Sequence, residues 1–592
     1  MLARHGWVEA GLLAVRMAAV AAGVLPVALG QTAPAPAQQT KPAQEIDHRV
    51  PVRSAPAKPK LVVMLVVDQM RADYVDKFKG QWNGGLKRLV EQGAWVRNAA
   101  YPYAATETCV GHSTISTGAF PATHGMISNE WWDRSLEKGV TCTADSSVKN
   151  MGYAGLNARG GDSAVRMLMP AFAEELKYQS AAGTRVVTFS LKARAAITMA
   201  GHQADAVTWF EPATGAWTTS SAYPVAAFVE EYANAHPVAN DYGKTWTLLL
   251  PENQYWYAKK AVGAVPPPGA GDSFPHTLRG KPGSTAPDAS FYGEWQGSPY
   301  AETYLAEMAA AAVDKMGLGK GPSTDYLGVS FSSVDYVAHA FGPRSWEVQD
   351  ELARLDRDLG AFFAHLDKAV GRGHYVVALS ADHGGAPIPD DLQKTGVDAG
   401  WLSVEAVQEN IEKTLDELGY TKPAVAEVGG SDVYFTPGTY EKLKADATAL
   451  RAVIRAIESV SGVARVYTAE ELQDRPATDS PIRRAEAASF FQARSGDLLI
   501  VPKPYWSWDF SRRGGPRTYG SMHGSPYYYD QRVPVLFMGF GIRPGEYYNA
   551  VTPADIAPTL AALCGITLAP RDGHVLGEAL SAAAPAGKSG KD

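Results

Sequence analysis

Six aspartate and histidine residues of this 592-residue chain have the types and the spacing of metal ligands: Asp68, Asp335, His339, Asp382, His383 and His523. Asp335 and His339 are four residues apart in SVDYVAHAFGP, so one helical turn would point both side chains to one side. Asp382 and His383 are adjacent in SADHGG, where the glycines permit a close backbone approach. Carboxylate and imidazole together suit zinc, and less exclusively manganese or cobalt. The sequence therefore predicts a divalent-metal site.

Each of these residues has a plainer interpretation when it is taken alone. An aspartate at the end of a strand is often a helix N-cap, and most of the 13 histidines need no special role. The Asp-His pair followed by two glycines, together with the Asp-x-x-x-His element, favours metal binding over these interpretations.

A candidate nucleophile lies in the segment TETCVGHSTISTG. Residues 109–117 read as a helix, with Thr108 at or near its N-terminus. The positive end of the helix dipole there favours an ionised hydroxyl and any phosphate bound to it. The alternatives are that Thr108 is a simple N-cap, that Thr106 is the cap, and that Cys109 is the nucleophile.

Two cations follow the predicted strand 185–190 in the segment SLKARAA. Lys192 and Arg194 are alternate residues, which share one face of an extended segment. Arginine binds charged phosphate oxygens bidentately, and a dianionic monoester offers more charge to two cations than a diester does. The alternative is a solvated surface pair.

Apolar, β-branched runs precede most of these polar residues and are typical of strands covered on both faces. The runs are residues 61–68, 185–190, 326–335, 374–382, 497–502 and 533–539. Helical patterns lie between them, at 85–93, 303–316 and 346–369. This alternation predicts an α/β sandwich with a mostly parallel central sheet. The candidate ligands follow the strands, at the carboxyl ends where open α/β sheets bind ligands.

Two stretches interrupt the alternation of strands and helices. Residues from about 203 to 300 are rich in Trp, Tyr, Pro and Gly, and are predicted to form an irregular, β-rich cap insertion. Residues from about 402 to 490 alternate helical and strand patterns, and are predicted to form a small α+β insertion.

The composition excludes some partners and leaves others open. The formal net charge is −7 and no Lys/Arg run stands out, so we expect no binding to nucleic-acid polymers. Cys109, Cys142 and Cys564 form no CxxC spacing, which disfavours a thiolate zinc site. One pair could form a disulfide in an oxidising compartment, and the sequence does not decide which. It carries no signal for an oligomeric state.

The N-terminus is typical of an exported protein. Residues 17–30 are apolar, follow several basic residues and end in small ones. This run of about 14 residues is shorter than the roughly 20 that span a bilayer. Residues 1–30 are therefore predicted to be a secretory signal peptide, with no stable membrane insertion after cleavage. The alternatives are a buried helix and an uncleaved anchor.

The following segment, 31–59, is rich in Pro and Ala and reads as a linker. The mature fold is expected at residues 60–585, and the signal peptide places it in the periplasm. No cysteine lies near the expected cleavage site, which disfavours a lipid anchor.

Several motifs together resemble the alkaline phosphatase superfamily. They are VVDQMR, TETCVGHSTISTG, HGMISN, SVDYVAH, SADHGG and MHGSP, with the late segment ADIAPTLAALCGI…RDGHVLG. The resemblance spans about residues 60–580 and implies an alkaline-phosphatase-like α/β/α sandwich. It implies two Zn²⁺ ions, with Mn²⁺ or Co²⁺ as possible substitutes. One ion would take Asp335, His339 and His523. The other would take Asp68, Asp382, His383 and the Thr108 oxygen.

Within the superfamily, the chain is most similar to the threonine-nucleophile, phosphate-irrepressible periplasmic alkaline phosphatases. Lys192 and Arg194 match their phosphate-binding Lys and Arg, while Asn129 matches an Asn that they share with nucleotide pyrophosphatase/phosphodiesterases. The resemblance implies hydrolysis of small-molecule phosphate monoesters through phosphothreonine, with weaker phosphodiesterase activity. The alternatives are a nucleotide pyrophosphatase/phosphodiesterase and, more remotely, a non-catalytic, metal-stabilised binding protein. Cys109 lacks the C/S-x-P-x-R context of sulfatases.

Overall fold

The computed structural model describes residues 58–581, except 157, 181–182, 474–479 and 513–514. The predicted signal peptide (1–30) and nearly all of the predicted linker (31–59) lie outside the described residues. Among the described helices, none has the length and apolar character needed to cross a membrane.

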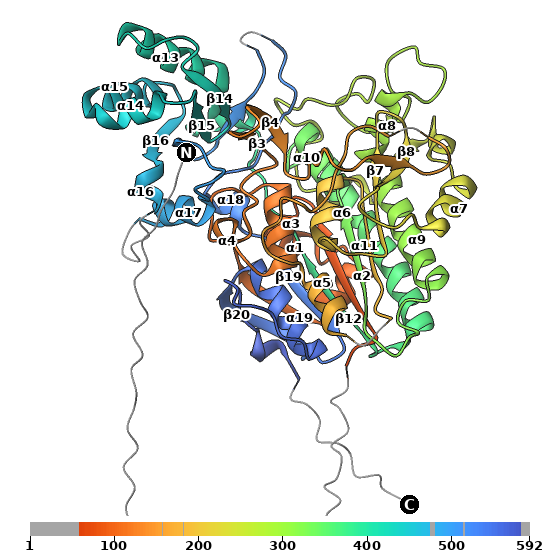
Figure 1. Ribbon diagram of the computed structural model, residues 1–592. Coiled ribbons are helices and arrows are strands. Elements are labelled where there is room, and N and C mark those ends of the chain that lie inside the picture. The colour runs from red at the N-terminus through yellow and green to blue at the C-terminus, as the bar shows by residue number, and fades with distance from the viewer. Residues whose placement is uncertain (1–57, 157, 181–182, 474–479, 513–514, 582–592) are drawn as a thin grey trace, which may run out of the picture. The chain divides into compact units, whose positions relative to one another are not determined.

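A ten-stranded sheet forms the centre of the fold, as the alternating strand and helix patterns predict (Figure 1). Its order is β20 (Gly545–Val551), β2 (Ala94–Ala99), β19 (Val535–Gly539), β12 (Tyr375–Ser380), β1 (Leu61–Val67), β11 (Asp325–Phe331), β6 (Val186–Ser190), β7 (Ala206–Glu211), β8 (Ala216–Ser220) and β5 (Asn150–Gly152). The five consecutive strands from β12 to β7 are parallel. Strand β19 runs antiparallel to both neighbours, and so does β8. The prediction of a mostly parallel sheet is confirmed.

Strand β1 shows why the sheet needs helices on both sides. All seven of its residues are buried, and alternate side chains enter two different hydrophobic cores. One core is closed by α1 (Ala72–Phe78), α2 (Gly85–Gln92), α9 (Pro299–Lys315) and α11 (Trp346–Leu366). The other is closed by α3 (Thr108–Thr117), α5 (Phe172–Gln179), α6 (Ala193–Ala200) and α19 (Ile556–Cys564). These two layers and the sheet make the predicted α/β/α sandwich.

A four-stranded antiparallel sheet lies in the region of the predicted α+β insertion, in the order β14 (Val425–Gly429), β15 (Asp432–Phe435), β17 (Leu498–Pro502) and β16 (Val463–Thr468). Helices α13 (Val404–Glu417), α14 (Thr439–Ala445) and α15 (Ala447–Glu458) share a separate hydrophobic core with it.

The prediction that residues 497–502 form a strand of the central sheet is wrong, because β17 pairs with β15 and β16 instead. Its alternate side chains enter two small cores, Leu498 and Ile500 on one side and Leu499 and Val501 on the other. A strand covered on both faces has the same apolar pattern in either sheet.

The region predicted as a β-rich cap begins inside the central sheet. The segment WFEPATGAW forms the turn and strand ends that join β7 to β8, so residues 206–220 extend the sheet and form no separate cap. Beyond β8 the chain is mostly irregular, with α7 (Ala227–Ala235), α8 (Ala289–Gln296) and two strands of two residues each. Of the β-rich character expected here, the described residues beyond β8 have only the short antiparallel pair β9 (Thr245–Trp246) and β10 (His276–Thr277).

Candidate active site

Asp335 and His339 lie on one helix, as their spacing predicts. Helix α10 (Ser333–Phe341) follows β11, with Asp335 in its first turn and His339 one turn later. His523 comes from the loop before α18 (Tyr528–Gln531), and its ligand atom lies within 4.8 Å of theirs. The three side chains form a first group that could hold a metal ion.

A second group of three candidate metal ligands follows β1 and β12, which are neighbouring strands of the central sheet. Asp68 follows β1, while Asp382 and His383 follow β12, and the strands pair in parallel with Val66 opposite Ser380. Their carboxyl ends therefore reach the same edge of the sheet, and the three ligand atoms lie within 4.8 Å of one another. All three residues are fully buried.

Each of the three histidines is oriented by a backbone carbonyl. The Nδ1 atoms of His339, His383 and His523 lie 2.6, 2.9 and 2.8 Å from the carbonyl oxygens of Ser521, Gly384 and Thr106. When a neutral histidine donates its Nδ1–H to a carbonyl, the free electron pair of the ring is on Nε2. Each Nε2 lies within 3.2–3.9 Å of a carboxylate oxygen of its own group. This is the tautomer that ligates a cation.

The residues of the second group fit a divalent cation. Asp68 Oδ1 and His383 Nε2 lie 3.5 Å apart, both buried, and neither has a hydrogen-bond partner among the described residues. Burial, and then the negative charges of Asp335 and Asp382, raise the pKa of Asp68 well above its usual range. A bound cation would offset the repulsion between the carboxylates with its positive charge. It would also coordinate the two buried atoms that have no hydrogen-bond partner among the described residues.

Lys192 is held between the two groups of ligands. Its Nζ lies 2.7 Å from Asp68 Oδ2 and 2.5 Å from Asp335 Oδ2, and its side chain is 9% exposed. Burial opposes its charge, but the carboxylates of Asp335 and Asp68 raise the pKa of Lys192 overall. Lys192 therefore carries a fixed positive charge at the junction of the two candidate metal sites.

Thr108 is the first residue of α3 and is 2% exposed. Helix α3 lies against the second ligand group at Gly111, where an added Cβ would come within 2.0 Å of the Asp382 carbonyl oxygen. One turn from Thr108, His112 Nδ1 lies 3.2 Å from Asp382 Oδ2. Glycine thus permits the contact that brings the N-terminus of α3 to the ligands.

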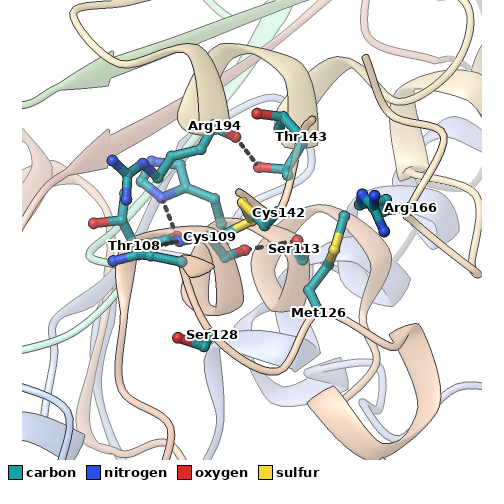
Figure 2. The surroundings of a disulfide bond; sticks show 12 residues. Thr108, Cys109, Ser113, Met126, Ser128, Cys142, Thr143, Arg166 and Arg194 are labelled. Carbon is teal, nitrogen blue, oxygen red and sulfur yellow. Dashed lines mark hydrogen bonds between the residues drawn. A yellow bond between two sulfur atoms is a disulfide. The ribbon is translucent and has the colours of Figure 1, made fainter. Parts of the chain in front are cut away.

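The two rivals of Thr108 have other roles in the structure. The Thr106 hydroxyl donates to the Ser525 carbonyl at 3.1 Å and does not cap α3. Cys109 is bonded to Cys142 in a disulfide, so its sulfur is no free nucleophile; Cys564 is a buried free thiol. Figure 2 shows the disulfide next to Thr108 and Ser128. The pairing that the sequence leaves open is therefore Cys109 with Cys142.

A cavity of about 560 Å³ brings the remaining candidates together. Among its lining residues are Thr108, Asn129, Lys192, Arg194, Asp335, His339 and His523. The expectation that Lys192 and Arg194 share a face of one extended segment is wrong. Lys192 is extended, whereas Arg194 is the second residue of α6, so the chain turns into a helix between them. Both side chains still reach the cavity.

Sequence reasoning missed two buried residues that hold the ligands in place. Gln69 donates from its backbone to Asp382 Oδ1 at 3.1 Å and from Nε2 to Asp335 Oδ1 at 2.9 Å. His112 connects Asp382 to Ser330, whose Oγ lies 2.8 Å from His112 Nε2. Their positions were a usable signal, since Gln69 directly follows a predicted ligand and His112 is one helical turn after Thr108.

Comparisons with known proteins agree with this fold. The family described as type I phosphodiesterase / nucleotide pyrophosphatase matches residues 62–526. Alkaline phosphatase PafA of Elizabethkingia meningoseptica is 33% identical over 524 residues, which cover 87% of this chain and 93% of the relative. Alkaline phosphatase PhoV of Synechococcus elongatus is 33% identical over 528 residues, with coverages of 86% and 90%. A crystal structure of PafA matches with a TM-score of 0.80 at 32% identity, covering 89% of this chain and 100% of that one.

The fold and these relatives define a phosphoric ester hydrolase with the alkaline-phosphatase-like architecture. The chain belongs to the type I phosphodiesterase / nucleotide pyrophosphatase family, within the alkaline phosphatase superfamily. The resemblance inferred from the sequence motifs is confirmed.

Proposed function

We propose that this chain is a divalent-metal-dependent alkaline phosphatase that hydrolyses small-molecule phosphate monoesters through a phosphothreonine at Thr108. The observation that carries the proposal is one cavity that contains Thr108, the first ligand group, Lys192 and Arg194. Two relatives that are each 33% identical over most of the chain are named alkaline phosphatases.

Two cations at the two ligand groups would supply charge stabilisation to the attacking and leaving oxygens. In the first step the Thr108 oxygen forms a bond to phosphorus, while the bond from phosphorus to the leaving alkoxide breaks on the opposite side. The N-terminus of α3 favours the ionised Thr108 hydroxyl and the phosphate that it then carries. In the second step a water oxygen replaces Thr108 on phosphorus and restores the hydroxyl.

Asn129 and Arg194 are proposed to bind the non-bridging phosphate oxygens. Both line the cavity, and Arg194 offers a bidentate donor pair. Lys192 adds its charge from between Asp68 and Asp335, so it acts on the ligand carboxylates as well as on the phosphate. A dianionic monoester gains more from these charges than a diester does, and we expect phosphodiesterase activity to be the weaker one.

The experiment that tests this is the ratio of kcat/KM for p-nitrophenyl phosphate to that for its methyl diester, on zinc-loaded protein at alkaline pH. A ratio well above one is expected. A ratio below one would assign the chain to the nucleotide pyrophosphatase/phosphodiesterases, the activity in its family's description. Stoichiometric zinc without turnover of either substrate would instead favour a metal-stabilised binding protein.

We further propose that two Zn²⁺ ions bind per chain, with Mn²⁺ or Co²⁺ as substitutes, since Asp and His donors suit these ions. Metal analysis of the purified protein measures both identity and number. We also propose a periplasmic location, supported by the apolar segment 17–30 and by a disulfide, which persists in oxidising compartments. Fractionation of cells that produce the full chain tests the location.

A further inference from the structure

The cavity that contains Thr108 extends well beyond the ligand groups. Its volume of about 560 Å³ is in the range of pockets that hold a drug-sized molecule, rather than phosphate alone. The lining residues farther from the ligands come from the hairpin β3 (Glu130–Asp133) and β4 (Lys138–Thr141), from β14 and its turn, and from β18 (Trp506–Asp509) and the segment after it. Most of this wall is therefore built by the insertion and the hairpin that faces it.

Several aromatic residues line this part of the cavity; Trp131 and Trp508 are buried, and we call the three less buried ones, Trp132, Phe510 and Tyr519, the aromatic wall. Phe510 is 57% exposed and Tyr519 is 44% exposed. The Tyr519 ring lies 4.9 Å from the His339 ring, so the aromatic wall begins at the first ligand group. The far edge of the Phe510 ring lies 3.6 Å from the position that a Cβ would take on Gly430, so this ring lies over the β14–β15 turn. Exposed aromatic rings that line a cavity are typical of a binding surface.

The basic side chains that line the cavity lie at its inner end, beside the carboxylate of Asp335, whereas the outer end has exposed carboxylates. The inner end has the cations Lys192 and Arg194, which are the only Lys or Arg residues among the described residues that line it. The outer end has the exposed carboxylates of Glu130 and Glu427. Partial burial, and then the negative charge of the nearby Glu130, raise the pKa of Glu427.

We propose that the aromatic wall, Glu130 and Glu427 form a leaving-group subsite that selects aryl phosphates whose aryl group is uncharged or cationic. The proposal rests on the proposed phosphatase function and names its substrate class. With the phosphate at the inner end, the alcohol portion of the substrate occupies the outer end, against aromatic faces and two carboxylates. Stacking favours a flat aryl group, and the carboxylates repel a leaving group that carries a carboxylate or further phosphates.

The first test replaces the rings of the aromatic wall. In Phe510→Ala and Tyr519→Ala, kcat/KM for phenyl phosphate is expected to fall about tenfold, since one aromatic contact contributes about that factor. For ethyl phosphate the fall is expected to stay below about twofold. The intrinsic reactivity of each ester is the same in every variant. The ratio of kcat/KM between variant and wild type therefore measures the contact between the ring and the leaving group. Tyr178→Ala, an exposed tyrosine on α5 outside the cavity, is the matched control.

The second test changes the charge of the outer end. In Glu130→Gln and Glu427→Gln, kcat/KM for 4-carboxyphenyl phosphate is expected to rise about threefold or more relative to phenyl phosphate. Glu458→Gln, an exposed residue of α15 in the same insertion but outside the cavity, is expected to leave this ratio unchanged. An unchanged ratio in both cavity variants would overturn the electrostatic part of the proposal.

A third measurement separates failure of the subsite from failure of the function. Phenylphosphonate and methylphosphonate are not hydrolysed, and their binding to zinc-loaded protein is measured by calorimetry. The subsite predicts tighter binding of phenylphosphonate in the wild type and a loss of that preference in Phe510→Ala. Absence of turnover with this preference intact would contradict the proposed function alone. If the wild type hydrolyses phenyl and ethyl phosphate and the two ring variants reduce both activities equally, the subsite is wrong and the proposed phosphatase function is retained.

Discussion

The backbone N–H of Cys109 donates a hydrogen bond to the side-chain Oδ1 of Asn129 at 2.9 Å. Asn129 is held by two further bonds, because its own N–H donates to Glu107 Oε2 at 2.7 Å and its carbonyl accepts the N–H of Cys142 at 2.9 Å. Cys109 and Cys142 are joined covalently. The disulfide thus connects the two segments that position Asn129 beside Thr108, and with its Oδ1 occupied Asn129 is left with its amide N–H groups for a substrate oxygen.

This relationship predicts that the disulfide positions a phosphate-binding residue. In the double variant Cys109→Ala, Cys142→Ala, kcat for a monoester should fall about tenfold because the Asn129 donor loses its fixed orientation. The free energy of unfolding should fall by about 2–4 kcal/mol, as is typical when a disulfide is removed. Steady-state kinetics and denaturant titration measure the two effects.

The control for the disulfide is Asn129→Ala. Removing the disulfide in that variant should cost much less activity than in the wild type, because the residue it positions is gone. Equal losses in both backgrounds would mean that the disulfide acts on stability or on Thr108 alone. Cys564→Ser, at the buried free thiol, serves as the cysteine control and should leave kcat unchanged.

Thr108 is expected to be the covalent nucleophile. Thr108→Ala should lower kcat by at least about a thousandfold while metal content stays near the wild-type value, and Thr108→Ser should retain measurable turnover. Rapid-quench labelling with a ³²P-monoester should trap phosphate on the wild-type chain and none on Thr108→Ala. Wild-type-like turnover in Thr108→Ala would refute the assignment.

We expect Lys192 and Arg194 to have different roles, although they are close together in the sequence. Arg194→Ala should lower kcat/KM for monoesters more than for diesters and leave metal content unchanged, since Arg194 lines the cavity and is proposed to bind the substrate phosphate. Lys192→Ala should in addition change metal affinity, because Lys192 Nζ contacts Asp68 and Asp335. Metal titration of both variants beside the substrate pair distinguishes them; identical behaviour would contradict the distinction.

Metal removal should destabilise the fold as well as abolish activity. Chelation leaves the buried carboxylates of Asp68, Asp335 and Asp382 with Lys192 as their neighbouring positive charge. An ion that binds only the native state stabilises it, by about 4 kcal/mol at a thousandfold excess over its Kd. The Tm of chelated protein should therefore be well below that of zinc-loaded protein and should recover when zinc is restored.

Glu486 on α17 (Pro481–Ser489) should make stability fall with rising pH. Burial, and then the charge of Asp432, raise the pKa of Glu486 to about 8 from an ordinary 4.5. The native state therefore binds a proton that the unfolded chain releases. Between pH 4.5 and 8 this one group should contribute a decrease in the free energy of unfolding of about 1.4 kcal/mol per pH unit.

In Glu486→Gln this contribution should disappear, so the variant gains stability relative to the wild type as pH rises across that range. Urea unfolding at several pH values measures the difference. Parallel pH profiles for the two proteins would show that the Glu486 pKa is not raised in the folded state.

Much of the site follows from local sequence patterns. The interval between Asp335 and His339 is a helical turn, Asp382 and His383 follow a strand, and Thr108 begins a helix as its segment predicts. The parallel order of the sheet then brings the ends of β1, β11 and β12 together, which is why separate motifs reach one place. These properties depend on periodicity and burial, which a sequence records residue by residue.

Only the tertiary structure decided which distant segments meet. Residues 497–502 pair in the smaller sheet and residues 206–220 extend the central one, although their apolar patterns suit either location. The choice of Cys142 as the partner of Cys109, the position of Lys192 between two carboxylates, and the aromatic wall beside His339 are likewise contacts across long stretches of chain. Such contacts depend on how elements pack, and local patterns constrain each element without selecting its neighbour.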